Sequence, residues 1–267
     1  MTRHRGLYQL VFCVLVLVAT VAVAANENLA KWRHLAEQGN VEAQAMLGVF
    51  YAFVAGVEDY TEAAKWYRKA AEQGHAGAQH GLGVMYRRGW GVLQNYAEAF
   101  IWFRRAAEQG HDFAQRDLGD MYARGEGVPQ NDVEATKWHR KATEQWRRAA
   151  EWGDANSQYY LCTAYTKDVL KSDAEATQWC RRAAEQGYIM AQYALGKRYA
   201  EGKGVLQDDV QAYAWFNIFA AQESGEFGEM AKNSRDRIAE SMTPEQRARA
   251  QQLSREYWGA YVVPFRN

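Results

Sequence analysis

Apolar residues recur along this chain at the spacing of an α-helix. From Ala78 onward, Leu82, Met85 and Tyr86 follow at i+4, i+7 and i+8, on one face of a helix with about 3.6 residues per turn. A second helical face comes next, and its apolar positions are Ala99, Trp102, Phe103 and Ala106. The pattern therefore predicts two consecutive helices with one apolar face each, which we call helix A and helix B.

Three sequence markers repeat in the same order along the chain. The phrase Ala-Glu-Gln-Gly, with one Ala-Glu-Trp-Gly variant, ends at Gly39, Gly74, Gly110, Gly153 and Gly187. A phrase with Gln at its second position and Leu at its fifth starts at Ala43, Ala78, Ala114, Ser157 and Ala191 and ends on Tyr. The third marker is Trp66, Trp102, Trp138, Trp179 and Trp215. Three markers in one register predict about five copies of a helix-turn-helix unit, with the Trp, Leu and Tyr markers in its core.

The ends of these helices carry capping signals. Each helix B begins with a short polar residue and has Glu or Gln three residues later, as in Asp59 with Glu62, Asn95 with Glu98, Asn131 with Glu134, Ser172 with Glu175, and Asp208 with Gln211. This is the pattern of a capping box, in which the two residues bond each other's backbone N–H. A Gly-x-Gly loop starting at Gly89, Gly125 or Gly202 follows three of the A helices. We interpret it as a turn, because a phosphate loop would follow a strand and carry a further Gly or Lys-Ser/Thr.

The composite A-Q-x-x-L-G-x-M-Y-x-x-G-x-G-V followed by E-A-x-x-W-x-R-K/R-A-A-E-Q-G resembles the Sel1-like repeat, a relative of the tetratricopeptide repeat. The resemblance covers about residues 29–258 and includes a C-terminal cap around Thr243-Pro244-Glu245-Gln246. It implies an all-α fold, an α/α solenoid (superhelix) of about five helix-turn-helix repeats with terminal capping helices. Such stacks bury each repeat against its neighbours and present a concave surface lined by the A helices.

The N-terminal segment has the features of a secretory signal. Arg3 and Arg5 precede an apolar run from Leu10 to Ala25, and Ala22-Val23-Ala24 is a small-x-small cleavage pattern. We therefore expect residues 1–24 to be a signal peptide and the protein to be periplasmic or secreted, with no membrane span after cleavage. The alternative is an uncleaved signal that anchors the chain in the inner membrane.

The repeat markers place the boundaries of the organisation. We expect a solenoid over residues 25–258, and its parts are a capping helix about 28–38, repeats about 40–74, 75–110, 111–153, 154–187 and 188–225, a C-terminal cap about 226–258, and a tail 259–267. The third repeat is seven residues longer than its siblings, so its helix B is expected to run without a break from about residue 132 to 152. The fourth repeat lacks the Gly-x-Gly loop over 166–171.

Two cysteines replace a packing pair in the fourth repeat. Cys162 takes the place of a helix A glycine such as Gly83, and Cys180 takes the place of a helix B ring such as Phe103. Because an exported compartment permits oxidation, a Cys162–Cys180 disulfide is expected, the alternative being two packed free thiols.

Composition and charge narrow the chemistry. Lys and Arg number 32 and Asp and Glu number 32, which argues against a nucleic-acid partner. The histidines have no metal-ligand spacing, so neither a metal nor a cofactor is expected. No serine has Lys three residues on, so the Ser-x-x-Lys nucleophile of the serine β-lactamases is absent. We identify no catalytic residue and expect a protein that is not an enzyme.

What remains is recognition. Helix A positions that vary among the repeats are the candidate partner-binding residues, namely His80, Val84, Arg88, Arg116, Asp120, Arg124, Tyr159, Thr163, Tyr193 and Lys197. The first hypothesis is a non-enzymatic exported scaffold or adaptor that binds a protein or peptide through this concave surface. The second is a binder of cell-wall glycan or peptide that uses Tyr159, Tyr160 and Tyr193 as platforms. A β-lactam-active enzyme is the third and is disfavoured.

Overall fold

The all-α prediction is confirmed by the structure, a computed structural model that describes residues 29–54, 58–166 and 172–265. These residues form α-helices and one short 3-10 helix, without any strand. The predicted signal peptide, residues 1–24, and most of the predicted loop 166–171 lie outside the described residues.

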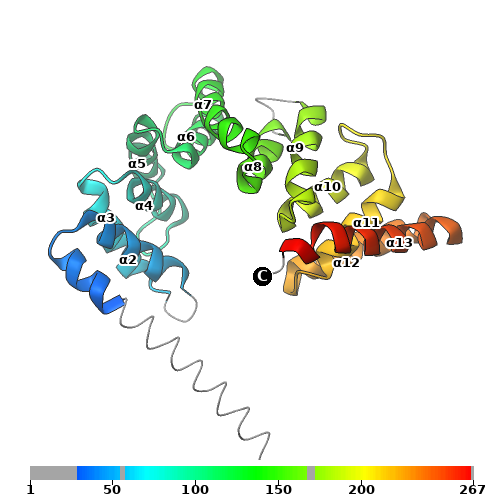
Figure 1. The fold of residues 1–267 in the computed structure, drawn as a ribbon. Helices are drawn as coiled ribbons and strands as arrows, with labels where there is room; N and C mark the ends of the chain where they lie inside the picture. Colours follow the sequence, from blue (N-terminus) through cyan, green and yellow to red (C-terminus); the bar gives the residue numbers. More distant parts are fainter. Residues whose placement is uncertain (1–28, 55–57, 167–171, 266–267) are drawn as a thin grey trace, which may run out of the picture. The chain divides into compact units, whose positions relative to one another are not determined.

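Helices A and B alternate along the chain (Figure 1). The A helices are α2 (Val41–Phe53), α4 (Ala76–Arg88), α6 (Asp112–Arg124), α8 (Ala155–Thr166) and α10 (Ile189–Glu201). The B helices are α3 (Tyr60–Glu72), α5 (Tyr96–Glu108), α7 (Asp132–Glu151), α9 (Asp173–Glu185) and α11 (Asp209–Ala220). Residues 29–37 are helical before them, and α12 (Gly225–Ser241), α13 (Pro244–Tyr261) and the 3-10 helix η1 (Val263–Phe265) follow.

The contacts divide the chain into two compact units, one ending at Asp132 and one beginning at Val133. In the first unit each helix from α2 to α6 packs against the next. In the second unit α8, α9, α10 and α11 pack in the same consecutive way, and α11 also packs against α12 and α13. Within each unit this is the arrangement of a helical repeat solenoid.

Two helices differ in length from their siblings. Helix α7 has 20 residues where α3, α5 and α9 have 13, as the two extra turns in the sequence predict. The last helix, predicted to end at residue 258, continues to Tyr261, and Val262 after it is buried. The expected tail is thus partly folded, because Phe265 lies so close to Gly187 that a Cβ there would meet its ring at 2.7 Å.

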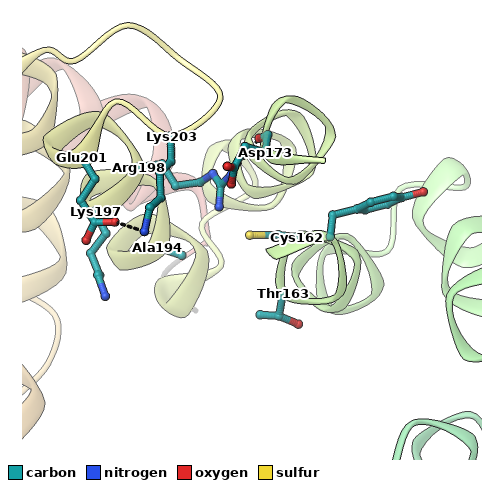
Figure 2. Close-up of a pocket in the computed structure, with 9 residues that line it drawn as sticks. Cys162, Thr163, Asp173, Ala194, Lys197, Arg198, Glu201 and Lys203 are labelled. Carbon is teal, nitrogen blue, oxygen red and sulfur yellow. Dashed lines mark hydrogen bonds and ion pairs between the residues drawn. The ribbon is translucent and has the colours of Figure 1, made fainter. Parts of the chain in front are cut away.

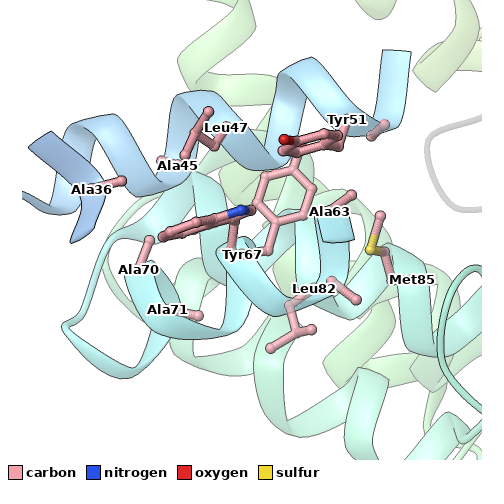
Figure 3. Packing of buried hydrophobic residues seen from close by; sticks show 14 of the residues in the cluster. Ala36, Ala45, Leu47, Tyr51, Ala63, Tyr67, Ala70, Ala71, Leu82 and Met85 are labelled. Atoms are coloured by element: carbon pink, nitrogen blue, oxygen red, sulfur yellow. The ribbon is translucent and has the colours of Figure 1, made fainter. Parts of the chain in front are cut away.

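The Leu and Trp markers form the core (Figure 3). The leucines are fully buried and the tryptophans are 2% to 8% exposed. Each buried Leu stabilises the fold by about 1.5–3 kcal/mol. The Tyr marker is only partly core: Tyr51 and Tyr165 are buried, whereas Tyr86, Tyr122 and Tyr199 are half-buried. Their position is explained by a hydroxyl that accepts hydrogen bonds, as in Arg181 Nη2 to Tyr199 OH at 2.9 Å.

The polar helix caps form, but mostly with one bond each. The side chains of Asp59, Asn95, Ser172 and Asp208 accept the N–H three residues on. Of the caps that the structure describes, only Thr243 has the complete capping box, with Gln246 Oε1 accepting the Thr243 N–H at 2.9 Å. The predicted return bond is therefore absent at the other four described caps.

The second glycine of each Gly-x-Gly loop packs against the preceding helix B. A Cβ at Gly91 would lie 2.0 Å from the carbonyl oxygen of Tyr60, and one at Gly204 would lie 2.0 Å from that of Asp173. Both glycines also have positive φ, 67° and 68°. The loop is thus a tight turn seated on backbone, as its sequence position predicts.

A glutamine ladder explains why Gln recurs in both repeat phrases. The buried helix A residue Gln79 donates from Nε2 to the Ala71 carbonyl at 3.1 Å, and its Oε1 accepts from Gln109 Nε2 at 2.7 Å. The same two bonds recur around Gln44, Gln158 and Gln192. Each ladder step joins a helix A to the helix B before it and the helix B after it, because the carbonyls that end a helix need external donors.

Candidate binding site

The candidate residues lie on the A helices of both units. Six are half-buried, three are exposed and one is buried, in that order His80, Val84, Arg116, Tyr159, Thr163 and Tyr193; Arg88, Arg124 and Lys197; and Asp120. Asp120 is only 9% exposed, so the expectation that it faces a partner is wrong for this residue. The other nine present side-chain surface.

In the first unit, the predicted residues His80 and Arg116 meet at a residue that the sequence analysis missed. Asp117 is buried, and its carboxylate accepts from His80 Nε2 at 2.9 Å and from Arg116 Nη2 at 2.9 Å. Arg87 lies 3.6 Å away and joins Asp117 to Glu126. Burial by itself would raise the pKa of Asp117, but the His80 hydrogen bond and the Arg116 charge outweigh it and hold the pKa below its usual value.

Two histidines expected to have loop roles cap helices. His75 Nδ1 accepts the Ala78 N–H at 3.0 Å and His111 Nδ1 accepts the Ala114 N–H at 3.3 Å. The His111 ring also stacks on His80, with centroids 4.9 Å apart. Burial, followed by the nearby His80, lowers the pKa of His111, which favours the neutral ring that a cap requires.

In the second unit the tyrosines pack against other rings. Tyr159 and Tyr188 have ring centroids 5.1 Å apart, and Tyr193 lies 5.1 Å from Phe219 and 5.4 Å from Phe216. Burial raises the pKa of Tyr159 and Tyr188. These rings are therefore engaged partly in packing between neighbouring helices.

A pocket of about 450 Å³ opens between α8, the start of α9 and α10 (Figure 2). It brings together the predicted residues Thr163 and Lys197 with residues not predicted, and its other lining residues are Cys162, Tyr165, Asp173, Ala194, Arg198, Glu201 and Lys203. Figure 2 shows Arg198 extending toward Asp173, with Cys162 and Thr163 on the facing helix.

Arg198 is the unusual residue of this pocket because it is a charged side chain only 4% exposed. Its guanidinium donates to the Asp173 carboxylate at 2.6 Å, to the Asp173 carbonyl at 2.8 Å and to Thr177 Oγ1 at 2.5 Å. A buried charge persists only when it is paired and hydrogen-bonded in this way. The sequence carried a signal for it, because Arg198 interrupts a column of apolar residues, Phe50, Met85 and Met121, in the aligned repeats.

The two lysines of the pocket differ in their surroundings. Lys203 Nζ lies 2.7 Å from Glu201 Oε2, and this hydrogen bond, followed by the glutamate charge, raises the pKa of Lys203. Lys197 is exposed and forms no hydrogen bond or ion pair with the described residues. Lys197 is therefore a cation available to a ligand.

Cys162 and Cys180 are joined by a disulfide, with Cα atoms 5.0 Å apart. Both residues are at most 1% exposed. The separation is within the range that a disulfide spans. The bond links helix A to helix B of the fourth repeat and forms one wall of the pocket.

The paired arginines of the B helices serve the scaffold. The first of a pair bonds a tyrosine hydroxyl, as Arg181 does with Tyr199, and the second covers a tryptophan ring, as Arg182 does with Trp179 at 4.6 Å. Arg105 and Trp102 repeat the second contact, also at 4.6 Å. These cations are engaged with rings of their own chain.

Two searches of the described residues complete the chemistry. No three His, Cys, Asp or Glu side chains in this part of the chain are grouped so as to hold a metal ion. Among the helices described, none combines the length and apolar character needed to cross a membrane.

The fold and the ladders define a helical repeat scaffold. The Sel1 repeat family model matches five segments, residues 41–75, 76–111, 112–145, 155–188 and 189–224. These segments make up more than half of the chain, so the chain belongs to the Sel1 repeat family.

Solved structures agree with this fold. A Sel1 repeat protein from Oxalobacter formigenes is 33% identical with a TM-score of 0.57, and the match covers 78% of this chain and 59% of that chain. A sel1 repeat protein from Klebsiella pneumoniae is 20% identical with a TM-score of 0.51, covering 79% and 99%. A protective antigen of uropathogenic Escherichia coli with an SLR fold is 27% identical, covering 89% and 73%, with a TM-score of 0.42. No curated protein matches the chain.

Proposed function

We propose that this protein is a non-enzymatic, exported scaffold that binds a protein or peptide partner through the surface of its A helices. One observation carries the proposal: residues that repeat along the chain are used internally, whereas the helix A residues that vary remain accessible. The repeated Gln, Trp and Leu residues make ladders and core. The variable residues Arg88, Arg124 and Lys197 are exposed.

The pocket beside α10 supports the same proposal. It lies on helix A residues, and it holds polar and charged groups that a partner's side chains would match. Arg and Tyr are also the side chains that contribute most at protein interfaces. The lack of a Ser-x-x-Lys motif is the reason for proposing binding rather than β-lactam chemistry.

The test is site-specific photo-crosslinking with the full chain in cell-envelope extract of the source organism. A benzophenone amino acid would replace Arg88 or Arg124 on the A helices, and the matched positions would be Lys65 and Arg105 on the B helices, all of them exposed. We expect adducts with a protein or peptide from the helix A positions only. Equal adducts from both sets, or none from helix A, would contradict the proposal.

Export rests on the pattern of residues 1–24, and it has its own test. We expect the chain recovered from the periplasm or medium to begin at Ala25, which intact mass measurement would detect. A chain that retains residues 1–24 in a membrane fraction would instead support the anchored alternative.

A further inference from the structure

The pocket lies where an aromatic ring lies in the first repeat. Tyr67 on α3 is wedged between two glycines, since a Cβ at Gly48 would approach its ring to 2.4 Å and one at Gly81 to 2.9 Å. The residues at the corresponding positions of the fourth and fifth repeats are Cys162 for Gly48, Cys180 for Tyr67 and Ala194 for Gly81. Cys162 and Ala194 line the pocket.

The disulfide joins the two helices without filling the space of a ring. A cysteine side chain ends at Sγ, whereas a tyrosine or phenylalanine ring extends several ångströms further. In the first repeat the ring of Tyr67 reaches across to the next helix A, at Gly81. In the fourth repeat both sulfurs are used in the bond between α8 and α9, so no side chain from Cys180 reaches Ala194 on α10. The pocket occupies the space this leaves.

The neighbours of the ring change from apolar to charged at the same place. In the first two repeats Tyr60 stacks on Trp90, with ring centroids 5.1 Å apart. Asp173 and Lys203 stand at these two positions in the fourth and fifth repeats, and Arg198 stands in place of the buried Met85.

The backbone frame around these positions is the same. Gly91 and Gly204 both approach the first carbonyl of the preceding helix B so closely that a Cβ would lie 2.0 Å from it. One frame therefore holds an apolar contact in the first unit and a charged pocket in the second.

The charges of the pocket leave an excess of one cation. Arg198 is paired with Asp173 at 2.6 Å and Lys203 with Glu201 at 2.7 Å. Lys197 has no such partner within the described part of the chain. A carboxylate entering this pocket would form a charge-assisted hydrogen bond with Lys197, which is stronger than one between neutral groups.

We propose that this pocket, opened where the Cys162–Cys180 disulfide replaces a glycine and a ring, receives an Asp or Glu side chain of the protein partner, and that Lys197 binds its carboxylate. The inference rests on the proposed function and makes it specific, because it names an acidic segment as the ligand of the helix A surface.

The experiment selects peptides from a random dodecapeptide library on the immobilised full chain. Recovered peptides are resynthesised, and each Asp or Glu is changed in turn to Asn or Gln. Binding is measured to the native chain and to three variants. Lys197→Gln removes the cation, and Cys162→Gly with Cys180→Phe restores the pair found at Gly83 and Phe103. Lys232→Gln is the control, since Lys232 lies elsewhere in the same unit and pairs with Glu229.

We expect one acidic position in the peptides to matter, its amide replacement raising Kd about tenfold on the native chain. That effect should vanish on Lys197→Gln, which is the signature of a direct pair in a double-mutant cycle. The ring-restoring variant should also bind about tenfold more weakly while melting cooperatively, and Lys232→Gln should bind as the native chain does. If the ring-restoring variant does not fold, the Lys197 cycle decides alone.

Two results would overturn the inference. Peptides that bind Lys197→Gln and the native chain equally, whatever their acidic residues, would show that the pocket is unused while leaving binding by the helix A surface intact. Failure to recover any peptide on a folded chain would count against the proposed function as well.

Discussion

Gly83 on α4 lies directly against the ring of Phe103 on α5, so that a Cβ at Gly83 would meet the ring at 2.7 Å. The same contact joins Gly48 to Tyr67 and Gly196 to Phe216. The glycine of the repeat phrase is therefore set by the packing of helix A on helix B, since a glycine inside a helix costs about 1 kcal/mol relative to alanine.

Gly83→Ala should lower the free energy of unfolding by about 1–2 kcal/mol, because overpacking costs about 1–3 kcal/mol and exceeds the helix-propensity gain. Urea unfolding would measure it. The control is Gly77→Ala on the same helix, where the nearest atom to a Cβ is the end of the His75 side chain at 3.2 Å. This variant should be neutral or more stable by up to about 1 kcal/mol, and equal losses at both positions would contradict the packing argument.

The Cys162–Cys180 disulfide should stabilise the second unit. Reduction with dithiothreitol should lower the free energy of unfolding by about 2–4 kcal/mol, because the bond restricts the unfolded chain. Urea unfolding with and without reductant tests this. The chain with Cys162→Gly and Cys180→Phe should not respond to reductant. Detection of two free thiols at these positions in protein purified without reductant would refute the bond.

Gln79 should be a stabilising residue although it is polar and buried. Gln79→Leu keeps similar bulk but leaves the Ala71 carbonyl without its donor and Gln109 without its acceptor. We expect a loss of about 1–3 kcal/mol in the free energy of unfolding. Gln178→Ala, at an exposed position of α9, is the matched control and should change stability by less than about 0.5 kcal/mol. Similar values for the two variants would exclude the ladder as a stabilising device.

Stability should fall as the solution is acidified below the usual histidine pKa of about 6.5. The pKa of His111 is lowered in the folded state by burial and by His80, against the opposite effects of Asp112 and Asp117. The unfolded chain then binds more protons at this residue, so its contribution is complete above the unfolded pKa and is lost as the pH falls through the folded pKa.

The melting temperature measured from pH 7.5 to pH 5 tests this dependence. His111→Asn keeps a capping side chain that does not titrate, so it should flatten the profile while leaving stability at pH 7.5 nearly unchanged. Asp117 also has a lowered pKa, but its contribution is lost only at more acidic pH, below its unfolded value. A profile that His111→Asn leaves unaltered would assign the acid sensitivity to another group.

The pattern of the sequence was sufficient for the helices, the repeat count and the family. Helical periodicity, N-cap residues and terminal glycines act within a few residues along the chain, so they can be read without knowing the fold. The length of α7 was predicted for the same reason, because seven added residues bring the apolar face round again. The Gly and ring substitution by Cys162 and Cys180 also stood out, because five aligned repeats define what each position normally holds.

The candidate site was only partly predictable. Variation among repeats identified Thr163 and Lys197, but it also selected Asp120, which is buried, and it passed over Asp117 and Arg198. Whether a varying residue is free or engaged depends on contacts such as that of His80 with Asp117, 37 positions apart. A comparison of repeats position by position does not contain such contacts between them.

The sequence by itself thus determined a stack of helix pairs, their caps and their core residues, because local hydrogen bonds and the helical period specify them. Only the tertiary structure decided where charge is buried and where space is left. Arg198 is stable in the interior because Asp173 and Thr177, 25 and 21 residues away, meet its guanidinium. The pocket exists because a disulfide fills less volume than the ring it replaces, a property of three helices packed together.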